Sequence, residues 1–328
     1  KNDLNKSEIT LQEVFDSYME KDHKKKVKEV TWRVTQNRLN QILDYFGKDC
    51  PLSEFELGKE SREKVMKMYD FLSIGKRHQG AIDHARRCRN LLKIVFRFAR
   101  SEGYMDENPV EQNDRVGVGH IKKSNPTINW DEVPELMKSI HENKCDGTKL
   151  TQLALKLHLM ICIRVGVVVR LEWDWYDNEK KMWEIPPETS GLKRKKGTTS
   201  DDYSHYIPVT HEMRQVIDEI RTFTGFQKYV FFSAEGKIFP HLNPETINTY
   251  LRRLGWGGRL TAHGWRDVPV TAGQEIGGFP REIIRRQIGH TDHKKGAIGS
   301  YDNTQFLEKR RKFMNWWTKE LVNQGMVI

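Results

Sequence analysis

Cysteine is scarce in this sequence, and its spacing excludes two common kinds of site. The four cysteines, Cys50, Cys88, Cys145 and Cys162, are scattered, and none forms a CxxC pair. They therefore indicate neither a structural zinc site nor a disulfide framework, and they fit a reducing cytoplasm. Long apolar runs are lacking too: no stretch of about 18 apolar residues indicates a membrane span, and the first residues do not read as a signal peptide. We therefore expect no metal site and no membrane partner.

Internal repeats and low-complexity segments are also absent from the sequence. A chain of 328 residues is too long for one ordinary core, so we expect about two domains. Aromatic residues make up 10% of the chain, which is enough to build packed cores. Lys and Arg outnumber Asp and Glu by 55 to 45, giving a net charge of +10. That excess favours a polyanionic partner such as nucleic acid.

The first part of the chain has a helical pattern. Apolar residues at helical spacing predict helices over residues 8–20, 30–46, 60–73 and 80–103. Thr10 followed by Glu13 forms a capping-box pattern near the start of the first helix. The composition then becomes polar and glycine-containing, which predicts a linker over residues 113–128 between domains at 1–112 and 129–328.

The second part of the chain mixes helices with short strands. Helical spacing predicts helices over 130–141, 149–170, 211–223, 244–254, 263–276, 280–288 and 305–323. The runs WEIPP from Trp183 and HYIPVT from His205 read as strands, and the basic turn GLKRKKGTTSDD lies between them. We therefore predict a mainly α fold with a small β-sheet, in which a helical domain joins a larger α+β domain.

The predicted helix over 80–103 has a basic face. Its basic residues are Arg86, Arg87, Arg89, Lys93, Arg97 and Arg100, and no acidic residue lies between Asp83 and Glu102. A charge run of this kind commonly marks only a solvated face, but the density of arginines without acidic partners favours phosphate contact. We expect the first five of these residues to contact DNA, together with Lys195 and Lys196 of the basic turn.

Cleavage of a phosphodiester without a metal needs three kinds of group. A nucleophile attacks phosphorus in line, cations hold the charge that builds on the nonbridging oxygens, and an acid protonates the leaving oxygen. The planar fork of arginine suits the second task, and lysine on a turn suits the third. Tyrosine suits the first, because it forms a covalent phosphoester that preserves the bond energy.

Taken one at a time, the candidates for these tasks have ordinary structural explanations. Arg164 lies in an apolar predicted helix, where a structural salt bridge would satisfy a buried arginine. His263 and Arg266 form an HxxR pair, which is common by chance. A helix end, a solvated basic loop and a surface tyrosine would explain the others, which are Gly289, His290, Lys193 and Tyr301.

The order and spacing of the whole set are less ordinary. Arg164 is followed by LEW at 171–173, the basic turn lies between two strands, and HGWR, GH and a tyrosine come after. In this order the chain resembles the tyrosine recombinase (phage integrase) family. The segments GFPREII, QIGH and LEKRRKFMNWW resemble prophage and genomic-island integrases in particular. The resemblance covers nearly the whole chain and implies a helical core-binding, SAM-like domain at 1–112 and a catalytic domain with a C-terminal tail helix at 129–328.

The resemblance implies a site-specific DNA recombinase with defined residue roles. Tyr301 would attack the scissile phosphate, form a 3′-phosphotyrosyl link and free a 5′-hydroxyl. Arg164 and Arg266 would clamp the phosphate, and Lys193 would protonate the leaving 5′ oxygen. The two histidines that would hydrogen-bond the phosphate are His263 and His290.

The resemblance also implies the setting of the reaction. No metal, ATP or other cofactor would be needed. A homotetramer on double-stranded DNA attachment sites would exchange strands through a Holliday junction, to integrate or excise a mobile element, and DNA-bending accessory proteins would assist. The protein would act in the bacterial cytoplasm on nucleoid DNA. A type IB topoisomerase-like enzyme and a DNA-binding protein whose catalytic set has decayed are the alternatives.

The chain departs from the family pattern at several positions. Val167 stands where the family has a glutamate that helps hold the active site, three residues after Arg164. Pro269 follows HxxR closely and would sit in the first turn of a helix or kink it. The other lysines of the basic turn compete with Lys193 for the role of general acid. No arm-binding domain is recognisable, so we expect a truncated core, whose tail helix packs in its own core or docks on a neighbouring protomer.

Overall fold

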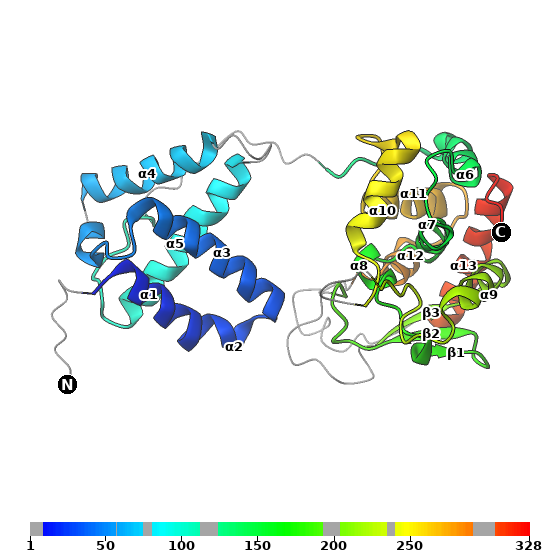
Figure 1. Cartoon of the computed structure of the whole chain (residues 1–328), viewed down its shortest axis with the longest axis horizontal. Coiled ribbons are helices and arrows are strands. Elements are labelled where there is room, and N and C mark those ends of the chain that lie inside the picture. Colours follow the sequence, from blue (N-terminus) through cyan, green and yellow to red (C-terminus); the bar gives the residue numbers. More distant parts are fainter. Residues whose placement is uncertain are drawn as a thin grey trace. The chain divides into compact units, whose positions relative to one another are not determined.

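A computed structural model describes residues 9–56, 58–74, 81–111, 124–192, 204–234, 240–290 and 306–328. The chain divides into two compact units, Lys1–Lys122 and Lys123–Ile328 (Figure 1). The described part is mainly helical with a three-stranded antiparallel sheet, which confirms the predicted fold class. None of its helices combines the length and apolar character needed to cross a membrane.

The first unit consists of helices joined by short turns. Its elements are α1 (Leu11–Tyr18), η1 (Met19–His23), α2 (Lys24–Lys26), α3 (Glu29–Phe46), η2 (Leu52–Phe55), α4 (Lys59–Ile74) and α5 (Ala81–Ser101). The predicted capping box is present, because the Thr10 hydroxyl accepts from the Glu13 amide at 3.3 Å and Glu13 Oε2 accepts from the Thr10 amide at 2.8 Å. The first helix therefore begins where the sequence predicts.

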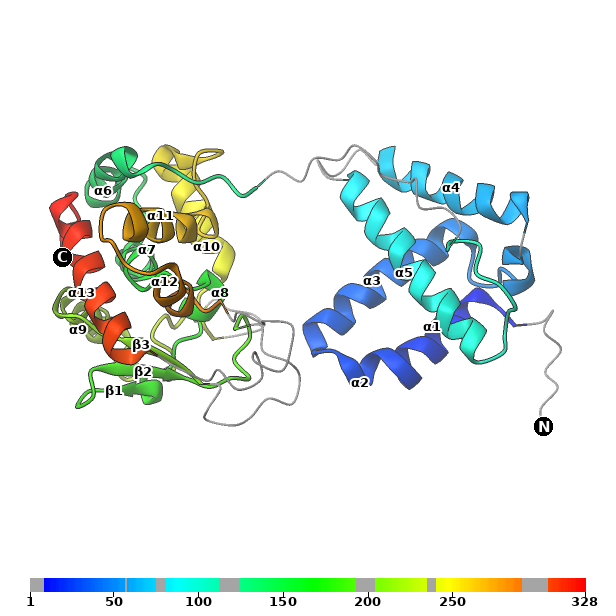
Figure 2. The same cartoon turned by 180° about the vertical axis from the view of Figure 1, so that it is seen from behind.

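Helix α5 forms the centre of the first unit and packs against α1, α3 and α4 (Figure 2). Its buried apolar side chains include Leu91, Leu92, Val95 and Phe96. These residues join apolar side chains from α1, α3 and α4 in one core. The four predicted helices of this unit are confirmed, with ends that differ by a few residues.

The second unit is built around the buried helix α7 (Lys149–Ile161), in which every residue from Thr151 to Ile161 is buried. The other helical elements are η3 (Trp130–Glu132), α6 (Val133–Glu142), α8 (Val165–Val168), η4 (Trp173–Trp175), α9 (His211–Thr224), α10 (Pro244–Leu251), η6 (Arg252–Trp256), η7 (Gly264–Asp267), α11 (Val268–Glu275), α12 (Arg281–Gln287) and α13 (Leu307–Asn323). Helices α8, α9, α10 and α13 all contact α7. Because these helices all pack on α7, its position determines where they lie.

The sheet of the second unit has the order β1 (Tyr176–Asp177), β2 (Met182–Ile185) and β3 (His205–Pro208). All neighbours are antiparallel, and Trp183 pairs with Ile207 across β2 and β3. The two predicted strands are confirmed as β2 and β3. Strand β1 was not predicted, because two residues are too few to show an alternating pattern.

Two of the predicted helices are interrupted, and both interruptions matter for the site. The predicted helix over 149–170 ends at Ile161, because Cys162 adopts a left-handed conformation with φ of 64°. Apolar residues continue through this break, so periodicity alone does not reveal it. The predicted helix over 263–276 begins as the 3-10 turn η7, and Pro269 lies at the start of α11, where proline is tolerated.

The end of the predicted linker belongs to the second unit. Ile128 is 5% exposed and joins the core of that unit. The Pro126 carbonyl accepts a hydrogen bond from the Thr261 amide at 3.2 Å. Pro126 and Ile128 therefore pack along the second unit, which the composition of the segment does not reveal. The linker bounds of 113–128 stay a prediction.

Helix α13 packs on its own unit. Its buried side chains include Phe313, Trp317 and Leu321, each 0% exposed, and Trp316 is partly buried against the same core. The helix contacts α7, β3, α9, α11 and α12. Of the two arrangements that the sequence left open for this helix, the structure has the one in which it packs in its own core.

Candidate active site

Arg164 lies in the sharp connection between α7 and α8. After the left-handed Cys162, the backbone of Arg164 is extended, with φ of −60° and ψ of 131°. Its NH1 donates to the Gly289 carbonyl at 3.0 Å. Its Nε is buried, and no residue in the described part of the chain accepts a hydrogen bond from it. The prediction that Arg164 lies within a helix was wrong, since the side chain leaves from the turn that follows α7.

The HGWR segment is held in place by its tryptophan. Trp265 is fully buried, and its indole Nε1 donates to the Leu159 carbonyl near the end of α7 at 3.0 Å. The Trp317 indole on α13 donates to the same carbonyl at 3.1 Å. With the tryptophan fixed, the two candidate residues of the segment lie in different environments: His263 is exposed, whereas Arg266 is 3% exposed.

A buried histidine supports the same segment from α7. His158 is 0% exposed, and its Nε2 lies 2.9 Å from the Ala262 carbonyl. Because a carbonyl can only accept, Nε2 carries the proton. Burial, together with the nearby Arg266 and His263, lowers the pKa of His158 to about 4, although the hydrogen bond to Ala262 acts in the opposite direction. The ring is therefore neutral near pH 7 and acts as a hydrogen-bond donor to the HGWR segment.

The glycine of HGWR is required by a close backbone approach. A Cβ added at Gly264 would lie 1.8 Å from the Pro126 carbonyl oxygen. The Gly264 amide donates to the Thr261 hydroxyl at 2.9 Å, and the Thr261 amide donates to Pro126. The start of the second unit thus crosses directly over the turn that carries His263 and Arg266, and only glycine leaves room for it.

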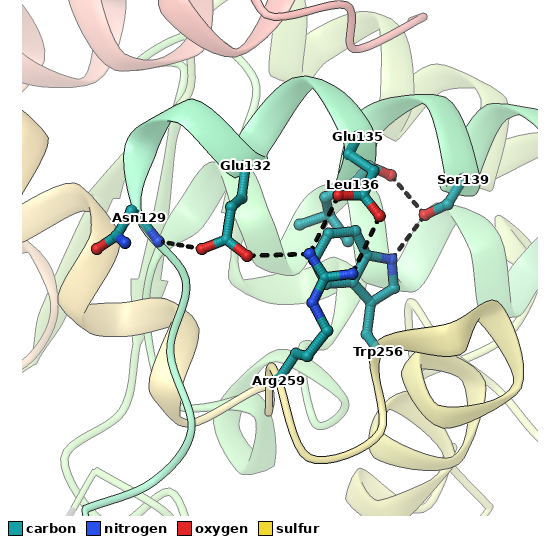
Figure 3. Close-up of polar contacts among 7 residues, drawn as sticks. All are labelled: Asn129, Glu132, Glu135, Leu136, Ser139, Trp256 and Arg259. Atoms are coloured by element: carbon teal, nitrogen blue, oxygen red, sulfur yellow. Dashed lines mark hydrogen bonds and ion pairs between the residues drawn. The ribbon is translucent and has the colours of Figure 1, made fainter.

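A second set of contacts fixes the segment just before HGWR to α6 (Figure 3). Arg259 donates to Glu135 at 3.0 and 3.1 Å and to Glu132 at 2.9 Å, and its guanidinium lies 4.2 Å from the Trp256 ring centroid. The Trp256 indole donates to the Ser139 hydroxyl at 2.9 Å. These contacts join η6 to the first turns of α6, so the approach to HGWR is held on two sides.

Three consecutive carbonyls at the end of α12 each accept from a basic side chain. The carbonyl of residue 287 lies 3.1 Å from His205 Nε2, that of residue 288 accepts from Arg266 NH2 at 2.7 Å, and that of residue 289 accepts from Arg164 NH1. Carbonyls at a helix C-terminus carry partial negative charge. They therefore orient these three cationic or polar groups without neutralising the two arginines. Gly289 makes the turn possible with φ of 72°.

The buried Arg266 and the half-buried Arg164 form a site of positive charge. Burial lowers the pKa of Arg266 to about 10, and the neighbouring Arg164 charge lowers it as well. Burial also lowers the pKa of Arg164. The Nε of Arg266, like that of Arg164, is buried and has no acceptor among the described residues. Two adjacent guanidinium groups with unused buried donors suit an anion that offers several oxygen acceptors, such as a phosphodiester.

Of the remaining candidate residues, one lies within the described part of the chain and four lie outside it. His290 follows the three carbonyls directly and is half-buried, and its amide donates to the Arg285 carbonyl at 2.9 Å. The structure thus brings His290 next to the segment that both arginines contact. Four predicted residues lie outside the described residues, and these are Lys193, Lys195, Lys196 and Tyr301.

Known proteins resemble the chain in both sequence and fold. A model of the phage integrase N-terminal SAM-like domain matches residues 10–55. The chain is 27% identical over 241 residues to prophage integrase IntA of Escherichia coli (strain K12), and 24% identical over 249 residues to the integrase of Enterobacteria phage P4. These matches cover 73% and 74% of this chain but 54% and 56% of the two relatives, so the chain spans little more than half their length.

Solved structures extend the likeness to the fold. A lambda integrase tetramer bound to a Holliday junction matches with a TM-score of 0.65 and 16% identity, over 89% of this chain and 80% of that one. The Tn1549 transposon integrase in complex with a circular intermediate DNA matches with a TM-score of 0.63 and 12% identity, over 92% and 99% of the two chains. The chain is therefore similar to integrases of the tyrosine recombinase family in sequence and in fold. The resemblance inferred from the motif order is confirmed.

The position that departs most from the family pattern is part of the core. Val167 is 0% exposed, and a Cβ added at Gly191 would lie 2.9 Å from its Cγ2. Gly191 has φ of 105°, which favours glycine. Leu192, which directly precedes Lys193, is 2% exposed. Packing against Val167 therefore fixes the start of the basic turn close to the short helix that follows Arg164.

Two residues at this site were not singled out by the sequence analysis. His205 is 1% exposed at the start of β3, and Gln287 is 0% exposed at the end of α12. They open the segments HYIPVT and QIGH, which were quoted for a strand and for the resemblance, but neither residue was proposed for the site. The available signal was weak, because only their burial shows that these polar side chains need partners.

The predicted basic face of α5 is not uniform in the structure. Arg89 is 5% exposed and donates to the Val110 carbonyl at 3.3 Å, so it is buried whereas Arg87 and Arg97 are exposed, and its contact with DNA stays a prediction. Arg86 and Arg87 both pair with Asp83 one turn earlier, and Arg97 pairs with Glu111 beyond the helix. Acidic partners are thus supplied from outside the 84–101 stretch. Lys93 is half-buried, and its contact with DNA stays a prediction.

Proposed function

We propose that this protein is a site-specific DNA recombinase, an integrase that cuts and rejoins DNA to integrate or excise a mobile element. The observation that carries the proposal is the convergence of Arg164 and Arg266 on two consecutive carbonyls, with an unused buried N–H on each. The names of the relatives, which are integrases of prophages and phages, support the same class.

In the proposed reaction, the arginine pair binds the nonbridging oxygens of the scissile phosphate. The Tyr301 hydroxyl attacks phosphorus, which forms a 3′-phosphotyrosyl bond and breaks the bond to the 5′ oxygen. Lys193 gives its proton to that oxygen, so a free 5′-hydroxyl results. Attack by the 5′-hydroxyl of another strand reverses the chemistry and rejoins the DNA. Since bond energy is kept in the phosphotyrosine, the proposal needs no cofactor.

The two histidines are proposed to assist from opposite sides of the arginines. His263 is exposed at the start of HGWR, where it can reach a bound phosphate and help take the tyrosine proton. His290 follows the carbonyls that hold Arg164 and Arg266, where it can donate to a phosphate oxygen. Both roles are supported by position along these segments.

The proposed partner is double-stranded DNA carrying attachment sites. We assign core binding to residues 1–112 and catalysis to 129–328, and the division into two compact units supports this assignment. The net charge of +10 supports binding to a polyanion. A homotetramer on the DNA is proposed because the lambda integrase with this fold forms a tetramer on a Holliday junction. DNA-bending accessory proteins and bacterial nucleoid DNA complete the proposal.

The proposal is tested with a nicked duplex that covers the DNA flanking the gene for this chain. The protein is mixed with the duplex in EDTA, and covalent protein–DNA products are separated on a denaturing gel. We expect a covalent band with the natural chain and none with Tyr301→Phe. A band that persists in Tyr301→Phe would move the nucleophile elsewhere. Tight binding without any band would favour a DNA-binding protein that does not cleave, and relaxation of any plasmid would favour a topoisomerase.

A further inference from the structure

Gln287 and Arg310 form a buried polar pair next to the arginine site. Gln287 ends α12, Arg310 lies in the first turns of α13, and both are 0% exposed. The Gln287 Oε1 accepts from Arg310 Nε at 3.1 Å and from Arg310 NH2 at 3.0 Å. Arg310 NH2 also donates to the Tyr206 carbonyl of β3. One arginine therefore joins α13 to both α12 and the sheet.

The orientation of the Gln287 amide follows from its partners. Arginine can only donate, so the oxygen of the amide faces Arg310. The Nε2 then faces the Ile161 carbonyl, to which it donates at 3.2 Å. Ile161 ends α7 three residues before Arg164. The side chain of Gln287 is thus held between α13 and the turn from which Arg164 departs.

The backbone of the same residue begins the row of carbonyls that contacts the arginine pair. The Gln287 carbonyl lies 3.1 Å from His205 Nε2, and the next two carbonyls accept from Arg266 and Arg164. A displacement of Gln287 would therefore move the acceptors of both arginines and one neighbour of the α7 turn together.

Burying this pair costs free energy, because one of its members is a guanidinium. Burial lowers the pKa of Arg310 to about 9, and the nearby Arg286 charge lowers it as well. A buried guanidinium is retained at a cost that a methionine of similar length would avoid. The geometry gives a reason for keeping the arginine, because only a forked donor reaches the Gln287 amide and the Tyr206 carbonyl together.

We propose that Arg310 and Gln287 are positioning residues for the phosphate-binding arginines, so that the tail helix α13 sets the geometry of the active site. This inference rests on the proposed function. Arg310 lies nine residues after Tyr301 and Gln287 fourteen residues before it in the sequence. The pair therefore also joins the two ends of the segment that carries the proposed nucleophile, which fixes both the arginines and the base of that segment to the same core.

The test compares Arg310→Met, Gln287→Leu and the double variant with the natural chain on the nicked flanking duplex. Arg311→Met is the matched control, because this neighbouring arginine is not buried and its hydrogen bond within the described residues is a 3.4 Å contact with the Lys180 carbonyl. We expect both single variants to bind the duplex with unchanged affinity but to form the covalent adduct about 10- to 100-fold more slowly at saturating protein, as misplaced groups do. The double variant should be no slower than the worse single variant, because both remove one contact.

Thermal unfolding shows whether each variant is folded, and Arg310→Lys, which keeps the charge but loses the fork, provides a milder change. We expect Arg310→Lys to cleave more slowly than the natural chain while binding DNA equally well. Folded variants that form adduct at the natural rate would overturn the positioning role. If the rate losses of the two single variants multiplied in the double variant, the two residues would act independently and not as a pair. A natural chain that forms no adduct would instead reject the proposed function, and the positioning role with it.

Discussion

Arginines in the two units of this chain are held in opposite ways. In the second unit, the neighbouring Arg164 and Arg266 are oriented by backbone carbonyls, with Arg266 buried and Arg164 half-buried. On α5 of the first unit, Arg87 and Arg97 are exposed and pair with carboxylates. A carboxylate neutralises the guanidinium, whereas a carbonyl fixes its direction and leaves its charge. The arginine pair of the second unit is thus positioned to bind one anion at a fixed place. The exposed arginines of α5 can instead exchange a weakly held carboxylate for a phosphate.

The largest effect expected from this contrast is on Arg266. Replacing it by alanine removes a buried donor aimed at the proposed phosphate, so we expect adduct formation to slow by about 10²- to 10³-fold. Arg214→Ala, which removes a half-buried arginine paired with Asp218 at 3.0 Å, should cleave at the natural rate. Single-turnover cleavage of the nicked duplex measures both. Equal losses in the two variants would show that buried position confers no special role.

The second expected effect concerns the backbone that crosses the HGWR turn. In Gly264→Ala, the new Cβ would meet the Pro126 carbonyl, so one of the two segments must move. We expect the free energy of unfolding to fall by about 3 kcal/mol, with a loss of cleavage because His263 and Arg266 shift. Gly257→Ala is the control, since its Cβ would meet only ordinary contacts at 3.5 Å or more. Denaturant unfolding would contradict the prediction if the two variants were equally stable.

Sequence patterns predicted the features of the molecule that depend only on residues close together in the sequence. The apolar spacing of α5 and α13 and the capping box at Thr10 each depend on residues a few positions apart, and each is confirmed. The order of motifs along the chain was enough to indicate the family. None of these required knowledge of which segments meet in space.

The remaining features depend on contacts between distant residues. The break after α7 is hidden because the apolar residues continue past Cys162. His205 and Gln287 are 82 positions apart, so no local sequence pattern indicates their contact. Arg89 has the same chemistry as its neighbours on α5, and only the packing of residues around Val110 buries it. Assigning every basic residue of a helix to one face does not reveal this difference.

The third expected effect is on the pH dependence of stability. The pKa of His158 is about 4 in the folded chain and 6.5 for a free histidine, because burial disfavours its charged form. The neutral ring is compatible with folding above pH 6.5, and stability is lost as the pH falls from there toward 4. We expect this loss to be about 3 kcal/mol and to be absent in His158→Gln, which keeps a donor for the Ala262 carbonyl. His141→Gln, at an exposed site, should keep the natural pH dependence of unfolding.

The smallest effect is expected on α5, where the buried and exposed arginines of one helix can be compared directly. Arg97→Ala should weaken DNA binding a few-fold and reduce the slope of log K against log salt by about one, as the loss of one phosphate contact requires. Arg89→Ala should leave that slope unchanged and lower stability instead, because Arg89 is buried against Val110. Binding isotherms at several salt concentrations decide between them. An unchanged slope in Arg97→Ala would remove this face from the DNA interface, whereas a reduced slope in Arg89→Ala would mean that the helix exposes this residue when it binds DNA.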